Sequence, residues 1–318
     1  MTQKGSIFME KTYTSCRKDY PVFYYTHYEV HETASDLAVT YHFEIPGLSS
    51  FAPTWCFPKK TKDTTNWSED PVLLRTIFSL GMVELISYWK IACPPKVVVK
   101  AGIINDAQIS WWKKLYYQGL GEFFYTNGIE ADPDTFMELV CEPSADIQKI
   151  ANVFTAKAEK NVADLAASDC GCLIPVGGGK DSACTIEMLK KSGHPLYTYI
   201  INPRGATLST VKVSGLSEDH SIHVKRTLDK NMLELNKQGF LNGHTPFSAL
   251  VAFSSVITAR MYGLKYVALS NESSANESTV AGSTVNHQYS KSFEFEQDFH
   301  TYEQDWLESG VYYFSMLR

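Results

Sequence analysis

The chain has 318 residues, of which 44% are hydrophobic and 20% are charged. This balance is typical of a globular protein with room for two domains, and it excludes disorder as the main state. The formal net charge of −6 argues against a nucleic-acid partner, because a phosphate backbone is bound by clustered Lys and Arg side chains.

The seven cysteines and the amino-terminal segment favour a cytoplasmic protein. A chain of this size needs no disulfides, so we expect reduced thiols. Cys170 and Cys172 have no second Cys or His pair at zinc-site spacing, and we expect them to pack in a core. The first residues lack the apolar stretch of a secretory signal, and the longest uncharged run, 246–259, is too short to span a bilayer. We therefore expect no membrane segment.

Residues 1–150 are predicted to form an amino-terminal α+β domain. Apolar and polar side chains alternate over 37–45, as in a half-buried strand, and 24–30 is its expected partner. Apolar residues three and four apart over 74–89 predict a helix that ends before Pro94. The other elements expected in this part are a strand at 96–100, a helix at 106–118, a turn with aromatic packing at 119–130, and a connecting helix within 143–169.

Residues 151–318 are predicted to form an α/β domain with a parallel sheet. A strand at 172–176, a glycine turn, a helix at 183–191 and a strand at 196–201 make a βαβ unit. The later expected elements are a strand at 221–225, a helix at 228–238, a helix that Thr245 caps and Pro246 begins, and a strand at 265–269. The final VYYFSMLR is apolar up to its last residue, which favours a domain that continues beyond Arg318.

The segment Gly177-Gly178-Gly179-Lys180-Asp181-Ser182 is the strongest functional signal. Adjacent glycines allow a sharp turn that presents several amides to an anion, and the positive end of the following helix adds to the attraction. The Walker pattern fails because Asp follows Lys180, and the dinucleotide pattern fails because Ser182 occupies the place of its third glycine. The sequence therefore predicts a phosphate-binding loop of a different kind.

The loop resembles the PP-loop, SGGxDS, of the ATP pyrophosphatases, a group with a Rossmann-like fold. The resemblance implies cleavage of ATP between its α and β phosphates, with transfer of AMP to an oxygen of the acceptor. Lys180 and the amides would stabilise the leaving pyrophosphate, Ser182 would donate a hydrogen bond, and Asp181 would orient the loop or hold Mg²⁺. Asn202 lies where this group places adenine, although a turn residue before Pro203 is an equal alternative. Gly177 departs from the pattern, which has Ser.

A second polar cluster, Ser270 to Glu296, follows the last predicted strand. Ligands of α/β sheets bind beyond the carboxyl ends of the strands, so Asn271, Glu272 and Asn276 are expected to face the same crevice as the glycine loop. This cluster also contains the hydrogen-bonding and titratable residues Asn286, His287, Lys291, Glu294 and Glu296. A solvated loop is the alternative. His244, before a predicted helix, is a further candidate unless it only caps or packs.

Several segments together resemble the MurL family of ATP-dependent epimerases, which act on UDP-N-acetylmuramoyl-L-alanyl-L-glutamate. They are GLGEFFYTN, NGHTPFSALVAF, SNESSAN, VNHQYSKSFEFE and YFSMLR. The resemblance implies conversion of the terminal L-glutamate to D-glutamate through an acyl-adenylate, with ATP and Mg²⁺. The positions that match this family are Glu122, His244, Asn271, Glu272, Asn276, Asn286, His287 and Lys291.

Adenylation explains why an epimerase would use ATP. The proton next to an ionised carboxylate is hard to remove because the enolate would carry two negative charges, and an acyl-adenylate removes one of them. His244, His287 and Lys291 are alternative bases, and Glu272 is a further catalytic candidate. Cys184 is expected in the core. Two other functions stay open: another adenylating enzyme, for tRNA modification or amide synthesis, or a nucleotide-binding protein without turnover.

Overall fold

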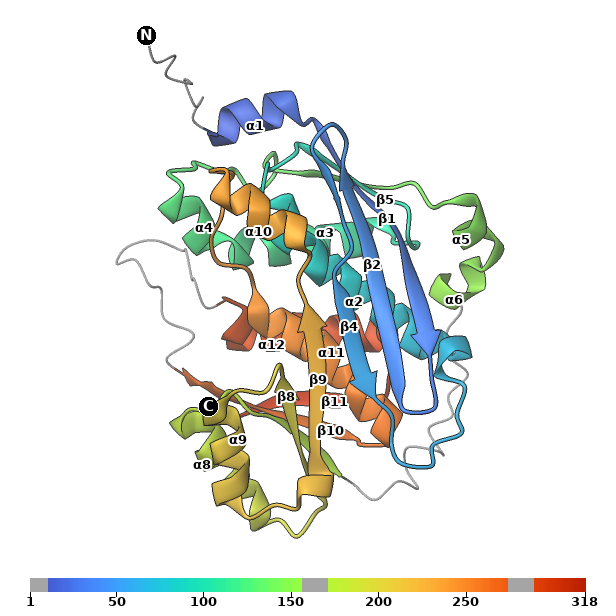
Figure 1. Cartoon of the computed structure of the whole chain (residues 1–318), viewed down its shortest axis with the longest axis vertical. Helices are drawn as coiled ribbons and strands as arrows, with labels where there is room; N and C mark the ends of the chain where they lie inside the picture. Colours follow the sequence, from blue (N-terminus) through green and yellow to red (C-terminus); the bar gives the residue numbers. More distant parts are fainter. Residues whose placement is uncertain (1–10, 156–170, 274–288) are drawn as a thin grey trace, which may run out of the picture.

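The structure is a computed structural model that describes residues 11–155, 171–273 and 289–318. The strands of these residues form one eleven-stranded mixed sheet in the order β11-β10-β7-β8-β9-β4-β2-β1-β5-β6, with β3 paired to β2 (Figure 1). The strands are β1 (Val22–Glu32), β2 (Asp36–Ile45), β3 (Ser49–Phe51), β4 (Thr54–Pro58), β5 (Lys96–Val99), β6 (Glu138–Cys141), β7 (Cys172–Pro175), β8 (Leu196–Ile201), β9 (Ser221–Thr227), β10 (Tyr266–Glu272) and β11 (Tyr312–Leu317).

Helices pack against this sheet. The α-helices are α1 (Tyr13–Asp19), α2 (Pro71–Trp89), α3 (Asp106–Gly119), α4 (Gly121–Thr126), α5 (Ala145–Lys149), α6 (Ala151–Thr155), α8 (Lys180–Lys190), α9 (Gly205–Ser214), α10 (Lys230–Lys237), α11 (Phe247–Tyr262) and α12 (Phe293–Tyr302). Short helical turns of other pitch are η1 (Trp67–Glu69), η2 (Glu218–His220), η4 (Tyr289–Lys291) and η5 (Glu303–Leu307). The predicted connecting helix is represented by α5 and α6, and residues 156–170 lie outside the described residues.

The long helix α2 forms the centre of the main core. Asp70 caps its amino end by accepting a 2.7 Å hydrogen bond from the Leu73 amide, and Pro71 occupies the first helical position. Length and apolar composition alone would allow α2 to cross a membrane, but 94% of its apolar window is buried inside the fold. Its apolar residues are therefore buried against β1, β2 and α11.

Strands β9, β8, β7, β10 and β11 run parallel to one another, with the first of them in sequence, β7, in the middle. Side chains that alternate along β7 enter two different cores. Leu173 belongs to the main core, to which α11 contributes, whereas Ile174 packs with Ile186 of α8 in a second, smaller core. Helices α8 and α9 lie on one side of these strands, and α11 and α12 lie on the other (Figure 1). Burial on both faces explains the continuous apolar run of β7, whereas β9 alternates the buried Ile222 and Val224 with exposed polar residues.

A buried ion pair joins the two parts of the sheet, β1–β6 and β7–β11, where β4 pairs antiparallel with β9. Glu84 of α2 is fully buried and accepts hydrogen bonds from both Arg226 Nε (3.0 Å) and Arg226 Nη2 (2.7 Å). Its Oε2 atom also accepts a 3.0 Å bond from the indole nitrogen of Trp55. The charge of Glu84 is thus satisfied by β4 and β9 together, which fixes the two strands relative to α2.

The structure corrects three local expectations. Residues 121–126 form helix α4 rather than a turn, because Phe123 and Phe124 are buried on one side of a helix. Helix α11 begins at Phe247, one residue later than expected. Its cap is Pro246, with no side-chain hydrogen bond from Thr245. Pro246 instead packs against Gly119, where an added Cβ would lie 2.7 Å from the Pro246 Cβ.

Two expectations about apolar residues have different outcomes. Cys184 is exposed, because α8 turns Thr185 and Ile186 toward the sheet, so its expected core position is wrong. Cys172 is buried as predicted, and the cysteines of the described ranges are free thiols. Most of the apolar final segment forms β11, which pairs parallel with β10 at the edge of the sheet.

Candidate functional site

A cavity of about 410 Å³ lies where β7, β8 and β10 end. From β7 the chain continues to β8 and β9 on one side of β7, and it later returns to β10 on the other side. The order in which the chain adds strands to the sheet therefore reverses between β7 and β10. Such a switch point is the usual ligand site of open α/β sheets. The cavity is lined by residues that follow these strands and by the first turns of three helices. They include Gly177, Gly179, Asp181, Ser182, Arg204, Thr207, Phe247, Ser248, Ser270 and Asn271.

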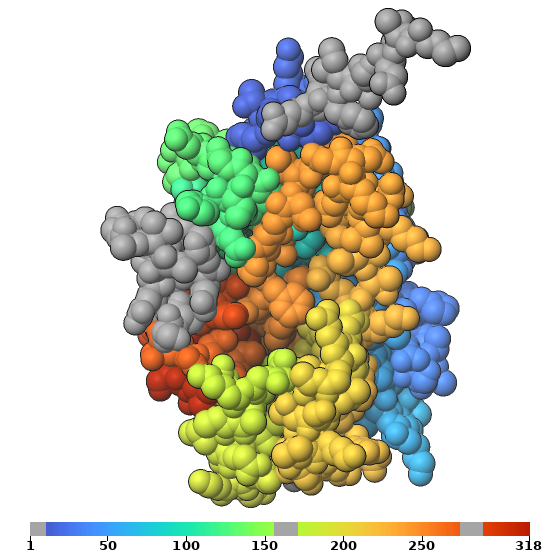
Figure 2. All heavy atoms as spheres, turned by 60° about the vertical axis from the view of Figure 1, so that its left-hand side comes forward, coloured from blue at the N-terminus to red at the C-terminus, as the bar shows by residue number. Residues whose placement is uncertain are grey.

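The molecular surface is hollowed on this side. Figure 2 shows the hollow between the green segment around α4, the orange segment of α10 and the start of α11, and the yellow segments of α8 and α9. These segments come from distant parts of the sequence. A ligand larger than the cavity at the strand ends would therefore contact segments from both halves of the chain.

The glycine loop approaches helix α9 closely. Gly178 has φ +85°, and a Cβ at this position would lie 2.9 Å from the Thr207 amide nitrogen and 3.0 Å from the Ala206 carbonyl carbon. Only glycine combines this backbone conformation with this contact at low cost. Gly179 caps α8, so the helix begins at Lys180, three residues before the predicted start at 183.

Three amides of the loop have no acceptor among the described residues. The Gly177 amide donates a 3.0 Å hydrogen bond to Ser182 Oγ, which fixes the buried Ser182 side chain under the loop. Within the described ranges, the amides of Gly178, Gly179 and Lys180 donate no hydrogen bond. Helix α8 adds the positive end of its dipole at the same place. Unpaired amides at a helix start are the ordinary construction of a phosphate site.

Two carboxylates and a lysine meet beside the loop. Lys180 Nζ lies 3.9 Å from Asp181 Oδ1 and 3.5 Å from Glu272 Oε1, and these side chains are partly to largely exposed. A hydrogen bond between the two carboxyl groups, followed by the cost of burial, raises the pKa of Asp181, while Lys180 and Lys291 act in the opposite direction. The predicted residues Asp181, Glu272 and Lys291 are therefore neighbours, and the carboxyl pair attracts positive charge.

Two predicted ligand residues make structural hydrogen bonds. Asn202 lines the cavity with a left-handed backbone (φ +51°), but its side-chain amide bonds both the carbonyl oxygen and the amide of Arg226, at 2.8 and 2.9 Å. Asn271 also lines the cavity, and its Nδ2 donates to Ser315 Oγ of β11 at 3.2 Å. Both side chains thus position neighbouring strands, and their contact with a ligand stays a prediction.

Helix α4 and the loop before α11 bring Glu122 and His244 together. His244 Nδ1 lies 3.8 Å from Glu122 Oε2. The loop is held in place by Lys90, which donates to the Gly243 carbonyl, and by Asn127 Nδ2, which donates to the Asn242 carbonyl at 3.0 Å. Burial lowers the pKa of Lys90 to about 8. His244 precedes Phe247, which lines the cavity, by three residues in the sequence.

The remaining predicted residues divide into two groups. Glu294 belongs to an ion-pair cluster with Lys114, and the buried Glu296 lies 3.4 Å from Arg318 Nη1. These contacts tie α12 to α3 and to the end of β11. Asn276, Asn286 and His287 lie outside the described residues.

Sequence reasoning missed Arg204 and Thr207, which line the cavity beside the glycine loop. The Arg204 amide donates to Thr207 Oγ1 at 3.0 Å, at the start of α9. The predicted second strand, now β8, could have indicated these residues. Parallel neighbouring strands end at the same edge of the sheet, so the residues that follow β8 lie close to those that follow β7. An arginine there is suited to phosphate oxygens.

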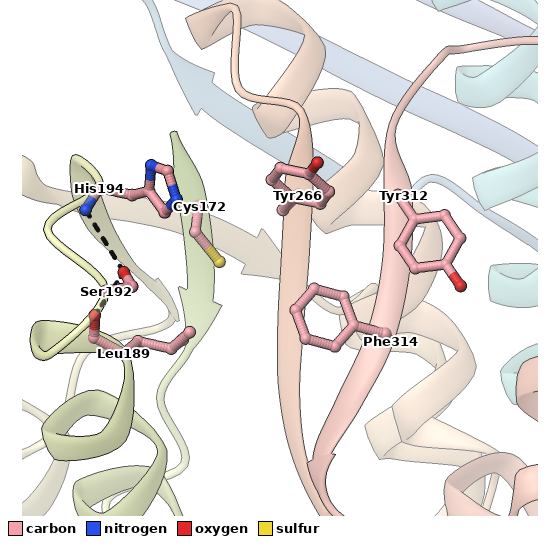
Figure 3. Close-up of a pocket in the computed structure, with 7 residues that line it drawn as sticks. All are labelled: Cys172, Leu189, Ser192, His194, Tyr266, Tyr312 and Phe314. Atoms are coloured by element: carbon pink, nitrogen blue, oxygen red, sulfur yellow. Dashed lines mark hydrogen bonds between the residues drawn. The ribbon is translucent and has the colours of Figure 1, made fainter. Parts of the chain in front are cut away.

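Another cavity, of about 330 Å³, lies at the opposite ends of the parallel strands (Figure 3). Cys172, Tyr266 and Tyr312 are the first residues of β7, β10 and β11, and all three line it. Burial raises the pKa of Cys172 to about 12, so this thiol is protonated and a poor nucleophile at neutral pH. The cavity at the carboxyl ends is therefore the better candidate for chemistry.

Comparison with known proteins gives the family. The model described as MurL N-terminal domain matches residues 14–316. A UDP-N-acetyl-alpha-D-muramoyl-L-alanyl-L-glutamate epimerase of Xanthomonas oryzae pv. oryzae is 30% identical over 75% of this chain and 49% of its own length. Proteins of the same name from a Micromonospora species and from Salinispora tropica are 31% and 29% identical, each over 70% of this chain and 46% and 45% of their own lengths.

The chain spans about half the length of the curated relatives it matches. No solved structure matches it. The family model covers the strands and helices that build both the sheet junction and the glycine-loop cavity. The chain therefore belongs to the family of the MurL N-terminal domain.

Proposed function

We propose that this chain carries the ATP-dependent step of an epimerase for UDP-N-acetylmuramoyl-L-alanyl-L-glutamate, in which the terminal L-glutamate is activated by adenylation and becomes D-glutamate. The observation that carries the proposal is the set of unpaired amides of Gly178, Gly179 and Lys180 at the switch point of the sheet. The names of the relatives supply the substrate.

The cavity suits ATP cleavage at the α phosphorus. A carboxylate oxygen of the substrate would attack this phosphorus, the bond to the β phosphate would break, and pyrophosphate would leave on the loop amides. Lys180 and Arg204 would stabilise the charge that develops on the leaving group. The strand order around β7 and the helix start at Lys180 support a PP-loop nucleotide site of Rossmann-like type.

Asp181 and Glu272 fit a Mg²⁺ ion. Their carboxyl groups share a hydrogen bond beside the phosphate loop, and carboxylate oxygens are the donors that Mg²⁺ prefers. When bound, the ion would offset negative charge on the phosphates. Lys180, within 3.9 Å of Asp181 and 3.5 Å of Glu272, would turn to the pyrophosphate when the carboxylates have a cation of their own.

His244 is our candidate for the α-proton base. Glu122, 3.8 Å away, would orient the imidazole, and the loop that carries His244 is anchored to α2 and α4. The base would take the proton of the acyl-adenylate from one face, and a proton would return on the other. Water would then release AMP from the D-glutamate product. Lys291, which lies near Asp181, is the alternative base among the described residues.

The test separates the chemical steps. The chain is incubated with ATP, Mg²⁺ and the UDP-muramoyl dipeptide, and AMP, pyrophosphate exchange and the chirality of glutamate are measured. Asp181→Ala should abolish exchange, whereas Glu187→Gln, an exposed carboxylate on the same helix, should retain it. His244→Asn should retain exchange and lose D-glutamate. Loss of exchange in His244→Asn would contradict its role as the base.

Other outcomes identify other functions. AMP that forms only with tRNA or with an amine acceptor would indicate a different adenylating enzyme. ATP binding without AMP formation for any acceptor would indicate a nucleotide-binding protein.

A further inference from the structure

The outer face of the amino-terminal sheet carries a cluster of two histidines and a glutamate, His27, Glu29 and His42. It lies on β1 and β2, distant in sequence from the glycine loop. Along β2, Tyr41 and Phe43 face the core, so His42 between them faces outward.

A β-bulge brings the other two residues to the same face. Tyr25 of β1 is buried, and a strand of regular period two would bury His27 as well. The register of β1 against β2 shifts between Tyr25 and His27, so His27 pairs with His42 and is exposed, as is Glu29. Bulges commonly redirect side chains at functional sites.

The donor atoms lie at distances close to those of a metal site. The two imidazole rings are stacked with centroids 4.1 Å apart and an angle of 5° between their planes. Glu29 Oε1 lies 3.7 Å from Nε2 of His27 and 3.7 Å from Nε2 of His42. In a tetrahedral zinc site, donors at about 2.0–2.1 Å from the ion are about 3.4 Å apart. Because a bound ion must lie in the plane of each imidazole, the two stacked rings would have to rotate apart to complete such a site.

Hydrogen bonds leave the Nε2 atoms available. Thr26 donates its only hydroxyl proton to the His42 carbonyl at 2.9 Å, so its oxygen accepts the 3.1 Å bond from Nδ1–H of His27. This tautomer places a lone pair on Nε2 of His27. Nε2 of His42 is buried and has no hydrogen-bond partner in the described part of the chain. Both imidazoles thus present an unused donor atom next to the same carboxylate oxygen.

We propose that His27, Glu29 and His42 bind a divalent transition-metal ion such as Zn²⁺. Two imidazoles with one carboxylate favour zinc and its neighbours over Mg²⁺ or Ca²⁺, which prefer oxygen donors. The adjoining cavity of about 360 Å³, lined by both histidines, leaves room for water to complete the coordination. The ion would connect β1 with β2 at the bulge, and the inference is independent of the proposed epimerase function.

The experiment uses the full chain, freed of metal with a chelator and held in excess Mg²⁺. Zn²⁺ is titrated by calorimetry, and Co²⁺ serves as a spectroscopic probe of its ligands. We expect one zinc site that His42→Gln and His27→Gln weaken by at least about 100-fold, since even the loss of a residue that only orients a ligand costs 10–100-fold. His31→Gln, an exposed histidine on the same strand and face, should leave the site unchanged.

Thr26 gives a second test. Thr26→Val should weaken zinc binding by about 10–100-fold, whereas Thr26→Ser should retain it. The histidines are at least partly exposed, with 54% and 28% of their side chains accessible, so their variants should fold, and metal-free melting curves check this. The proposal is overturned if His42→Gln binds as many zinc ions, with the same affinity, as the unsubstituted chain.

Discussion

Replacing Gly178 by alanine should damage both the fold and the proposed nucleotide site. At φ +85° a non-glycine residue costs about 1–2 kcal/mol. The added Cβ would also approach the Thr207 amide nitrogen to 2.9 Å and the Ala206 carbonyl carbon to 3.0 Å, and these are backbone atoms that must move. Overpacking of this kind costs about 1–3 kcal/mol. The sum is a loss of about 2–5 kcal/mol in the free energy of unfolding.

Thermal unfolding measures this loss. Each kcal/mol lowers Tm by about 2–4 °C in domains of 150–250 residues, so Tm should fall by at least about 4 °C. The close contact of the added Cβ with α9 can be relieved by moving the loop away from α9. This movement displaces the amides of Gly178 and Gly179. ATP-dependent pyrophosphate exchange should therefore fall together with Tm.

Gly179→Ala is the matched control. Gly179 has φ −97°, and no atom lies within 4 Å of a Cβ built there. Its stability should stay within about 0.5 kcal/mol of the unsubstituted chain or rise slightly, because alanine restricts the unfolded state. Equal losses in the two variants, or no loss in Gly178→Ala, would refute the argument from backbone conformation and contact.

Three further predictions concern the loop, the sheet junction and a buried lysine. Gly177→Ser should leave Tm unchanged, because a Cβ there meets only Ser182 Oγ at 3.8 Å, and the added hydroxyl should lower the KM for ATP; a Tm loss like that of Gly178→Ala would contradict this. Glu84→Leu should cost about 3–5 kcal/mol in urea denaturation by leaving the Arg226 charge buried, and Glu84→Leu combined with Arg226→Met should recover most of it. Burial lowers the pKa of Lys90 from 10.5 to about 8, so between these pH values the unfolded chain binds a proton that the folded chain does not. The free energy of unfolding, measured relative to Lys90→Met, should therefore rise with pH across this window by up to about 3 kcal/mol, and a flat difference would contradict the assignment.

The periodicity of the sequence predicted most of the elements around the site. The alternating residues of β2, the stripe of α2 and the unit of β7 and α8 are local patterns, in which burial on one face or both fixes which residues are apolar. Helix α9 and strand β11 escaped prediction. The segment that became α9 shows only weak amphipathic character, and β11 is an edge strand formed by pairing with β10.

The exposed Cys184 and the helix α4 show the limit of local reasoning. Which side of a helix faces the sheet depends on how the helix packs. Thr185 and Ile186 lie on the buried side of α8, and Phe123 and Phe124 pack in the main core. Neither choice is encoded in the spacing of nearby residues alone.

The sequence by itself determined the glycine loop, because glycines, a lysine and a helix start within six residues are a local arrangement that does not depend on distant parts of the chain. Only the tertiary structure decided what stands around that loop. Arg204 reaches the cavity because β8 lies beside β7, and Glu272 reaches Asp181 because the chain returns to β10. His42 meets His27 and Glu29 because a bulge reverses the outward face of β1. Contacts between distant segments follow from strand order and register, which depend on the packing of the whole core.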